Sequence, residues 1–452
     1  MNELTMAQAL SLVKQAESVG REERAVIRQS RLKNLVEYVR SHSPYFREYY
    51  KDVGDDFKLT DLPVSNKRTL MAKFNDWVTD PAVTADSVKK YLEDKDNIGR
   101  LFLDKYTVLT TSGTSGVPLT MVRDSYHNTI HGAFMKERLL RDIDPGLMNP
   151  ERHRIASVIA TDSFSSSYTS FERARNAKPE FAQNMLAISI MTPVAEIVRI
   201  LNTFKPDLLT GYPSVLAALA LERLKGKLEI TPLAVACSAE QLTGETHATL
   251  KQAFNCPILN NYCSTEGGEA AMMCEHGNLH INDDWVIIEP VDQNNQPIAD
   301  GSISSSVLIT NLSAYTQPVI RYLLEDRVRI LETPCQCGSN LPFMEIMGRE
   351  GDTICLNGKS IPSVVFQVLM YKIPGALQFQ FAQTGPESLE LRVLLMDGVD
   401  SAAFAATMKD HIAKLFTENG CQEAAFKISS EPPRNSGKGG KLKTVCREWN
   451  MY

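Results

Sequence analysis

A short run of hydroxyl and glycine residues is the first part of the chain that could do chemistry. Residues 110–118 read Thr-Thr-Ser-Gly-Thr-Ser-Gly-Val-Pro, after an apolar run at 106–109 that predicts a strand. Glycine lets the backbone turn several N–H groups towards one point, and Ser and Thr hydroxyls add uncharged donors. The run is not a P-loop, because no Gly-Lys-Ser/Thr follows. It predicts a site that holds a polyphosphate and can release pyrophosphate; an ordinary loop is the alternative.

Four cysteine and histidine residues form a second candidate site. Cys274 and His280 are separated by five residues, and Cys335 and Cys337 by one. Three thiolates and one imidazole suit tetrahedral Zn²⁺, and four protein ligands would make the zinc structural. His276 is an alternative to His280, and four unrelated residues are the other reading.

Alternating strands and helices are expected to position these residues. The pattern predicts helices at 193–204, 214–224 and 243–254, and strands at 208–210, 233–236 and 258–262. Such alternation indicates a parallel sheet, whose ligands lie beyond the carboxyl ends of the strands. Those ends carry Gly211-Tyr212, Ser238-Ala239-Glu240 and residues 262–266.

The flanking segments differ in character. Residues 6–43 are expected to be helical and 44–97 to be mixed helices and loops, while strands are expected at 285–291, 306–312 and 328–331. Beyond a boundary at 348–352 come a helix from 363, strands near 377–382 and 389–395, a helix at 402–416 and a strand near 424–428. We therefore predict an α/β protein. Its large N-terminal domain, 1–347, has parallel and mixed sheets, a β-rich subregion and a helical extension at 1–97. A small mobile α+β domain, 348–452, follows.

Bulk properties narrow the classes of function. The chain has 452 residues, a formal charge of -6 and a pI near 5.9, which argues against nucleic acid as a partner. No apolar run is long enough to span a membrane, and the first 20 residues lack a signal-peptide core. Nine cysteines in so long a chain do not suggest a disulfide framework. We expect a cytoplasmic protein; a homodimer is left open.

Five features in order carry a family resemblance. They are the hydroxyl–glycine loop, Asn-Tyr-Cys-Ser-Thr-Glu at 261–266, Arg321-Tyr322 with Asp326, Gly348-Arg349 with Asp352, and Gly-Lys-Leu-Lys at 440–443. Together they resemble the adenylate-forming superfamily of acyl-CoA synthetases, adenylation domains and luciferases. The run at 31–50 is similar to the opening of its phenylacetate-CoA ligase branch. The likeness covers nearly the whole chain.

The resemblance implies an ATP-dependent, AMP-forming ligase. Such an enzyme activates an aryl or similar small carboxylic acid as its adenylate and transfers the acyl group to CoA, with Mg²⁺ as the metal of the nucleotide. One alternative is an adenylating enzyme whose acceptor is a carrier protein or an amine. The other is a catalytically silent nucleotide-binding homologue.

The resemblance also implies roles for individual residues, each of which has an ordinary structural alternative such as a core aromatic or a helix-start acid. The outer phosphates are assigned to Thr111, Ser112, Gly113, Thr114, Ser115 and Gly116; the α-phosphate to Thr265; Mg²⁺ to Glu266; the adenine to Tyr262; the nucleotide pocket to Glu240; the ribose to Asp326; the ribose or phosphate side to Arg349; and adenylation to Lys441, with Lys438 second.

The acid is expected between the strand ends and the segment 161–173, where relatives have a glycine- and aromatic-rich loop. Its pocket is assigned to Phe164, Tyr168, Tyr212, Pro213, Ser238 and Ala239. Two departures from the family pattern are notable. The loop before Asp326 is bulkier than in relatives, and the hinge position is occupied by Gly351. Because glycine can absorb large backbone changes, this position can still act as a hinge.

Overall fold

The computed structural model describes most of the chain. The described residues are 4–111, 119–161, 163–190, 192–242, 244–349, 353–362, 365–366, 369–370, 373, 375–395, 398–429, 431–434 and 444–449. Several residues singled out above lie outside them, namely Ser112, Gly113, Thr114, Ser115, Gly116, Gly351, Asp352, Lys438 and Lys441.

The chain divides into two compact units. One comprises residues 1–324 and 328–345, and the other residues 325–327 and 346–452. The break after residue 345 lies next to Gly348, where the sequence predicts a domain boundary. That the boundary acts as a hinge stays a prediction.

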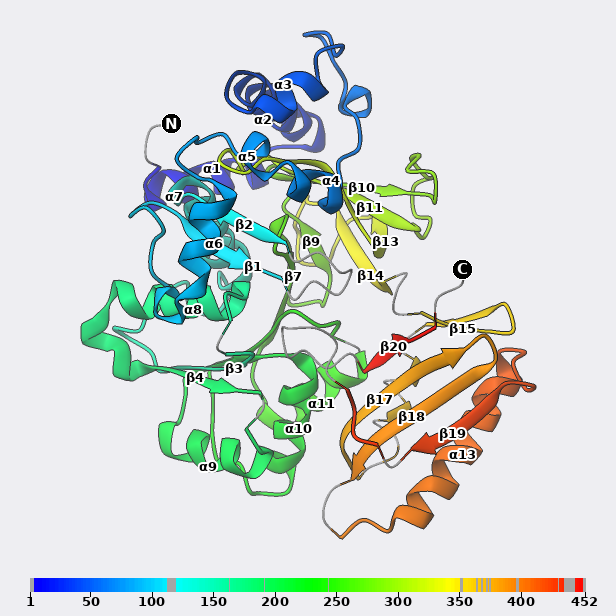
Figure 1. Ribbon diagram of the computed structural model, residues 1–452. Coiled ribbons are helices and arrows are strands. Elements are labelled where there is room, and N and C mark those ends of the chain that lie inside the picture. Colours follow the sequence, from blue (N-terminus) through cyan, green and yellow to red (C-terminus); the bar gives the residue numbers. More distant parts are fainter. Residues whose placement is uncertain are drawn as a thin grey trace. The chain divides into compact units, whose positions relative to one another are not determined.

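A nine-stranded mixed sheet has the strand order β13-β14-β9-β8-β7-β6-β5-β3-β4 (Figure 1). Strands β4, β3, β5, β6 and β7 run parallel, and β8, β9 and β14 continue the sheet in antiparallel pairs. The bounds are β3 Ile155–Ile159, β4 Met185–Ser189, β5 Leu208–Gly211, β6 Ala234–Cys237, β7 Ile258–Ser264, β8 Gly268–Met273, β9 Leu279–Ile281, β13 Asp326–Leu331 and β14 Phe343–Arg349.

Helices connect the parallel strands. They are α8 Ser166–Ala177, α9 Val194–Phe204, α10 Pro213–Leu224 and α11 Gly244–Phe254, with the 3₁₀ turn η4 Pro179–Asn184. Helix α10 contacts both α9 and α11, and all three pack on strands of the sheet through one apolar cluster that includes Leu201, Leu216 and Val235 (Figure 1). The alternation predicted for residues 193–262 is confirmed.

Two smaller β elements complete this part of the fold. Strands β1 Thr107–Thr110 and β2 Thr120–Arg123 form an antiparallel hairpin around the hydroxyl–glycine loop. Strands β10 Val286–Val291, β11 Ser306–Asn311 and β12 Val319–Leu324 form a three-stranded antiparallel sheet, which is the predicted β-rich subregion. After β2 come α7 Ser125–Phe134 and one π-helical turn, η3 Met135–Leu139.

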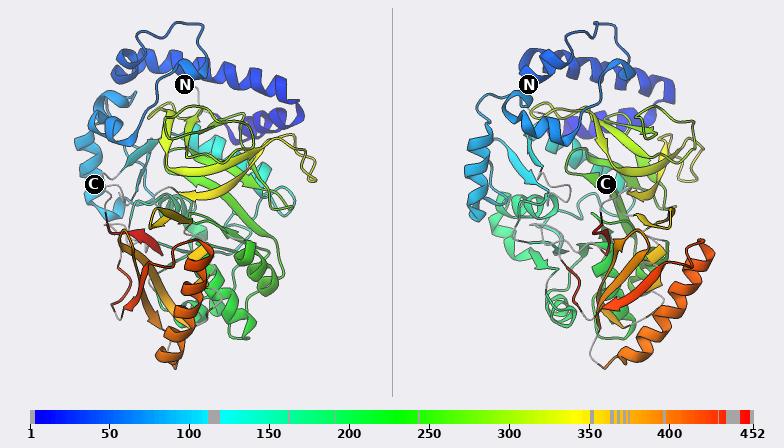
Figure 2. Two further views of the ribbon diagram at one scale, coloured as in Figure 1. Left: turned by 90° about the vertical axis from the view of Figure 1, so that its right-hand side faces the viewer. Right: turned by 45° about the vertical axis from the view of Figure 1, so that its right-hand side comes forward.

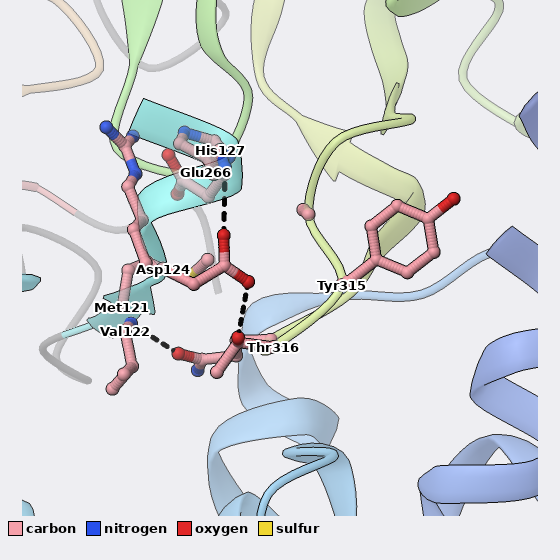
Figure 3. A pocket seen from close by; sticks show the side chains of 10 residues that line it. Met121, Val122, Asp124, His127, Glu266, Tyr315 and Thr316 are labelled. Atoms are coloured by element: carbon pink, nitrogen blue, oxygen red, sulfur yellow. Dashed lines mark hydrogen bonds between the residues drawn. The ribbon is translucent and has the colours of Figure 1, made fainter. Parts of the chain in front are cut away.

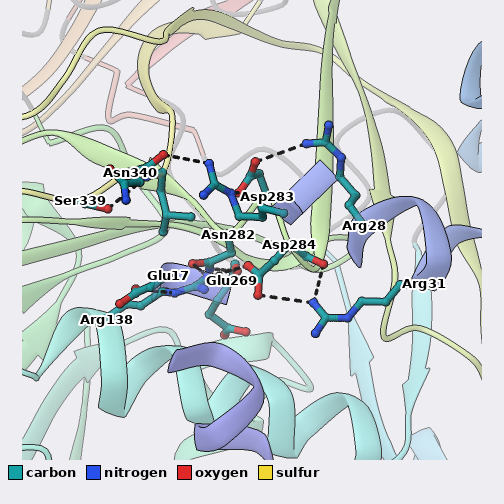
Figure 4. Close-up of polar contacts among 12 residues, drawn as sticks. Glu17, Arg28, Arg31, Arg138, Glu269, Asn282, Asp283, Asp284, Ser339 and Asn340 are labelled. Carbon is teal, nitrogen blue, oxygen red and sulfur yellow. Dashed lines mark hydrogen bonds and ion pairs between the residues drawn. The ribbon is translucent and has the colours of Figure 1, made fainter. Parts of the chain in front are cut away.

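The N-terminal helices are fastened by buried ion pairs. Helices α1 Met6–Ser18, α2 Arg21–His42 and α3 Pro44–Tyr49 lie at one end of the first unit (Figures 1 and 2). Arg24 pairs with Asp283 at 2.7 Å, and the buried Asp284 pairs with Arg31 and Arg138 (Figure 4). The segments α4 Lys67–Ala72, α5 Phe74–Trp77, α6 Ala85–Glu93, η1 Leu59–Asp61 and η2 Lys95–Asn97 follow.

The second unit has its own core. The bounds of its elements are β15 Thr353–Leu356, β16 Lys359–Pro362, β17 Ala376–Gly385, β18 Ser388–Leu395, α13 Ser401–Glu418, β19 Ala425–Ser429 and β20 Val445–Arg447. The sheet order is β19-β18-β17-β20, and β15 pairs with β16. Phe381, Leu391 and Met408 are among the buried side chains of the cluster between sheet and helix.

Two details differ from expectation. The helix expected over 6–43 is two helices, because Gly20 takes an extended conformation as the N-cap of α2. The segment 161–173 is helical from Ser166 onwards. The helix expected from 363 lies partly outside the described residues. None of the helices in the described part of the chain has the length and apolar character needed to cross a bilayer.

Candidate active site

The ends of β5 and β6 bring several predicted residues together. The Ser238 N–H donates a 3.1 Å hydrogen bond to the Gly211 carbonyl. Ala239 has a φ of 65°, a conformation that costs a non-glycine residue about 1 kcal/mol or more and is frequent at functional sites. The carboxylate of Glu240 then accepts a 3.1 Å bond from the backbone N–H of Ser214, in the first turn of α10.

The aromatic residues assigned to the acid pocket are well packed. The Tyr212 hydroxyl accepts a 3.3 Å bond from the Ala160 N–H, and Tyr212 and Tyr168 belong to one apolar cluster. Phe164 is buried, with its ring centroid 5.8 Å from that of Tyr91. These contacts give each ring a place in the core, and their contact with an acid stays a prediction.

Thr111 closes the base of the hydroxyl–glycine loop. Its N–H donates to the Leu119 carbonyl at 2.9 Å, and its hydroxyl accepts from the Leu119 N–H at 3.2 Å. The two ends of the loop are therefore fixed to each other, and the hairpin β1–β2 holds them from below.

The turn after β7 carries Thr265 and Glu266. The guanidinium of Arg123 donates to the carbonyl oxygens of Thr265 at 2.8 Å and Ser264 at 3.3 Å. The Gly267 N–H donates to the Ser264 hydroxyl at 2.8 Å. The Tyr322 hydroxyl donates to Glu266 Oε1 at 3.4 Å. Glu266 therefore extends from a turn whose backbone is held on several sides.

The two glycines after Glu266 are required by space. A Cβ at Gly267 would lie 2.1 Å from Cδ1 of Ile309. At Gly268, where φ is 67°, it would lie 2.3 Å from Cε1 of His131. A Cβ at Gly267 would require the Ile309 side chain to move, and one at Gly268 would displace the His131 ring and strain the backbone.

His131 fixes the far side of this turn. Its Nδ1 atom lies 2.8 Å from Glu269 Oε2 and 3.0 Å from the Glu269 N–H, and its Nε2 atom lies 3.2 Å from Ser313 Oγ. Burial alone would raise the pKa of Glu269, but the His131 ring and the Arg123 charge lower that pKa to about 2. Glu269 is therefore a carboxylate at neutral pH.

A small cavity lies behind Glu266 and is lined also by Asp124, His127 and Thr316 (Figure 3). The Asp124 carboxylate caps α7 by accepting from the His127 N–H at 2.8 Å, and it accepts from the Thr316 hydroxyl at 2.6 Å. Burial, with His131 and Arg123 nearby, holds the pKa of His127 well below its usual range, so this ring is neutral. The cavity has a volume of about 10 Å³, which suits one water molecule.

Three other predicted residues are placed as follows. Tyr262 is buried in β7, opposite Ala271 of β8. Asp326 is buried at the first position of β13. Arg349 is the last residue of β14, and its side chain is outside the described part of the structure.

The predicted metal ligands do come together. One ligand atom from each of Cys274, His280, Cys335 and Cys337 lies within 4.8 Å of the others. The two sulfurs of Cys274 and Cys335 are 3.8 Å apart. Zn–S bonds of about 2.3 Å in a tetrahedron give sulfur–sulfur separations close to this value. The donor set and its spacing therefore fit zinc.

Neighbouring groups orient His280 and favour the thiolate of Cys335, whereas burial and the adjacent cysteines raise the pKa of Cys337 to about 12. His280 Nδ1 lies 2.9 Å from the Leu341 carbonyl, so a proton there leaves Nε2 free to ligate. Burial opposes ionisation of the Cys335 thiol, but N–H groups of Cys337 and Asn278 near its sulfur help to lower its pKa to about 6. The thiolate is the form that a metal binds.

The sequence analysis missed Arg123, His127, His131 and Glu269. A signal for part of this group was present. Asp124 is an N-cap, and His127 and His131 are four residues apart, which places both on one face of the helix that follows the hairpin.

The chain is similar to several known proteins. No family model matches the chain. It is 23% identical over 468 residues to phenylacetate-coenzyme A ligase of Thermus thermophilus, covering 95% of this chain and 97% of that protein. It is 25% identical over 228 residues to the protein CapK of Staphylococcus aureus, and this match covers 49% of each. A solved structure of 2-hydroxyisobutyryl-CoA ligase superposes with a TM-score of 0.69 and 18% identity, covering 96% of this chain and 92% of that one.

The chain has the adenylate-forming ligase fold. The anthranilate CoA ligase AuaEII is a more distant example, with a TM-score of 0.52 and 13% identity over 74% of this chain and 64% of that one. The resemblance to the adenylate-forming superfamily, and to its phenylacetate-CoA ligase branch, is thereby confirmed. In this adenylate-forming ligase fold, the β1–β2 hairpin and the Thr265–Glu266 turn belong to the same unit and are joined by Arg123.

Proposed function

We propose that this protein is an AMP-forming acid–thiol ligase that activates an aryl or similar small carboxylic acid with ATP and transfers it to CoA. The observation that carries the proposal is the similarity to phenylacetate-coenzyme A ligase over 95% of the chain. The Thr265–Glu266 turn, bonded to Arg123 at the end of strand β2, supports it.

In the first step a carboxylate oxygen of the acid attacks the α-phosphorus of ATP, and the bond to pyrophosphate breaks. Both reactants are anions, so the chain's main task is to arrange donors and positive charge. The roles proposed are those of the family: the loop residues Thr111, Ser112, Gly113, Thr114, Ser115 and Gly116 on the outer phosphates, Thr265 on the α-phosphate, Tyr262 and Glu240 around the base, Asp326 and Arg349 near the ribose, and Lys441 between carboxylate and α-phosphate.

Mg²⁺ is the cofactor that we propose for Glu266. A hard cation favours carboxylate oxygen and neutralises phosphate charge when bound. The carboxylate of Glu266 is well suited to hold it, because the backbone of the turn that carries it is fixed.

In the second step the CoA thiolate attacks the acyl carbon, and AMP leaves. Phe164, Tyr168, Tyr212, Pro213, Ser238 and Ala239 are proposed to surround the acid. Since the rings of this set are engaged in the core, an acid that reaches them is expected to be small.

Zinc is the second cofactor that we propose, held by Cys274, His280, Cys335 and Cys337. With four protein ligands it would have no open position, so its role is structural. It would join the chain after β8 to the segment before β14 and so support the strand that follows the Glu266 turn. We also propose that the enzyme works in the cytoplasm.

Product analysis tests this function. The protein is incubated with ATP, Mg²⁺, a panel of aryl and short acids, and CoA, an amine or a carrier protein as the acceptor. The nucleotides and the acyl products are then separated. We expect AMP, pyrophosphate and an acyl-CoA. An acyl product formed only with an amine or a carrier protein would change the acceptor, and ATP binding without turnover for every acid would indicate a silent homologue.

A further inference from the structure

Three polar side chains on one face of helix α8 have no partner in the described part of the chain. They are Ser165, which directly precedes the helix, Thr169 and Arg173, so each is four positions from the next. Residues at this spacing share a helix face. Among the described residues, the hydroxyl oxygens of Ser165 and Thr169 are buried without a hydrogen-bond partner, and the Arg173 guanidinium has neither a hydrogen bond nor an ion pair.

Helix α8 begins beside the end of strand β1. The Thr110 N–H donates to the Phe164 carbonyl at 2.7 Å, and α8 contacts β1 (Figure 1). Near the other end of this face, a Cβ at Gly99 would lie 2.7 Å from the backbone nitrogen of Arg173, so glycine lets the segment after η2 pack closely on the helix. The face is therefore well packed, and Thr169 is only 1% exposed.

Arg173 differs from the next arginine of the helix. Arg175 is exposed and pairs with Glu172 at 3.6 Å. Arg173 is half-buried, and burial lowers its pKa with no carboxylate of the described residues to oppose that effect. Taking a charge out of water without a partner costs free energy. A cation kept in such a place indicates an anionic partner from outside the chain.

All three groups can donate hydrogen bonds, so the missing partner is an acceptor. Long side chains on a helix lean towards its N-terminus, which places Arg173 on the side of Thr169. The guanidinium fork matches the oxygens of a carboxylate or a phosphate, and a hydroxyl one turn away can add a further bond. The Thr169 oxygen is closed to solvent, so an anion reaches it only when neighbouring side chains rotate.

We propose that Arg173 and Thr169 form an oxyanion site on α8, which binds a phosphate or carboxylate group of a substrate. The identity of that substrate rests on the proposed function, in which ATP and CoA carry phosphates and the acid carries a carboxylate. Helix α8 also carries Tyr168, one of the residues proposed to surround the acid, so one helix would serve both sites. The binding of an anion does not itself depend on that function.

Anion titration of the full-length protein tests the proposal. The wild type, Arg173→Gln and Arg175→Gln are titrated separately with inorganic phosphate, CoA and benzoate in a calorimeter. Loss of a charge-assisted hydrogen bond weakens binding about 10- to 100-fold. We expect Arg173→Gln to bind at least one of these ligands more weakly by about that factor. Arg175→Gln, the matched control on the same helix, should bind all three as the wild type does.

The pattern across the ligands identifies the group that is bound. Weaker binding of phosphate and CoA by Arg173→Gln assigns the site to a phosphate, and weaker binding of benzoate alone assigns it to a carboxylate. Equal affinities of Arg173→Gln and Arg175→Gln for all three ligands would overturn the proposal. If phosphate binding depends on Arg173 but no acid yields AMP, the proposed function fails while the oxyanion site stands.

Thermal melts separate binding from a structural role. Removing an unpaired, half-buried cation relieves its desolvation, so Arg173→Met is expected to melt no lower than the wild type without added anion. Thr169→Val keeps the shape of the side chain and should also keep the melting temperature, while it weakens the ligand identified by titration. That ligand should raise the melting temperature of the wild type but not of Arg173→Met. A lower melting temperature in Arg173→Met, with full stabilisation by the ligand, would show that the arginine supports the fold instead.

Discussion

The Nε2 atom of His280 lies 3.3 Å from Sγ of Cys337, although the two residues are 57 positions apart in the chain. Cys274 and Cys335 complete the group. We predict that the purified protein contains about one zinc per chain and that His280→Ala loses it, with a lower melting temperature, because a structural site with one ligand missing binds far more weakly. Metal analysis by mass spectrometry and a thermal melt measure both.

His276→Ala is the matched control for this prediction. His276 lies close to the same segment but is exposed, with Glu275 as its neighbour at 3.5 Å, and it is not part of the four-residue group. This variant should keep its zinc and its melting temperature. Equal zinc content in His280→Ala and the wild type would contradict the assignment.

Lys441 gives a prediction that depends on the sequence alone, because the residue is outside the described part of the structure. Lys441→Ala is expected to slow formation of the adenylate at least about 100-fold, corresponding to about 3 kcal/mol of transition-state stabilisation. Lys438→Ala should retain most activity. Rates of adenylate formation in a single turnover compare the two, and the reverse order would move the role to Lys438.

Glu269 links stability to pH. Its pKa in the folded protein is about 2, compared with 4.5 in its ordinary state. Because the folded pKa is lowered, the carboxylate contributes stability above pH 4.5, and this contribution is lost as the pH falls towards 2. Glu269→Gln is therefore expected to lower the free energy of unfolding by about 2–3 kcal/mol at neutral pH.

The pH series is the decisive part of that experiment. Urea unfolding of wild type and Glu269→Gln is measured from neutral pH downwards, and the difference between them should shrink below pH 4.5. A difference that stays constant or grows with acid would show that the carboxylate charge is not the cause.

The buried Asp284 should be important for stability. It lies 3.0 Å from Arg138 and 3.4 Å from Arg31, and Arg138 is itself buried (Figure 4). Removing one partner leaves buried positive charge, so Asp284→Asn is expected to lower the free energy of unfolding by about 3 kcal/mol or more. Urea unfolding measures this value. Glu196→Ala, which breaks an exposed pair with Arg199, should leave the melting temperature unchanged, and equal effects of the two variants would contradict the prediction.

Much of the fold could be predicted because local patterns and global packing agree. The helix–strand alternation of residues 193–262 has strong periodicity, and its elements are found within a few residues of their expected bounds. The cluster of Cys274, His280, Cys335 and Cys337 was also recognisable, since three thiols and an imidazole have few other reasons to occur at such spacing. The helix α8 was not foreseen, because its serine-rich segment carries little periodic signal. Strand β4, a run of five residues, was missed as well.

The group behind Glu266 shows what sequence alone could not give. Arg123 contacts residues 141 and 142 positions later in the chain, and Asn311 reaches Gly267 across a different sheet. Bonds of this kind depend on tertiary placement, so no local pattern identifies them. The resemblance predicts that Glu266 binds a metal, but the sequence could not show which residues hold its turn.

Pyrophosphate exchange tests the central claim most directly, since it reports adenylate formation whatever the final acceptor is. The protein is incubated with ATP, Mg²⁺, labelled pyrophosphate and one acid at a time, with Glu266→Gln as the inactive comparison. We predict that label enters ATP with at least one small carboxylic acid, only when acid and Mg²⁺ are both present, and that Glu266→Gln abolishes it. Absence of exchange with every acid, or exchange that Glu266→Gln leaves intact, would contradict the proposed chemistry.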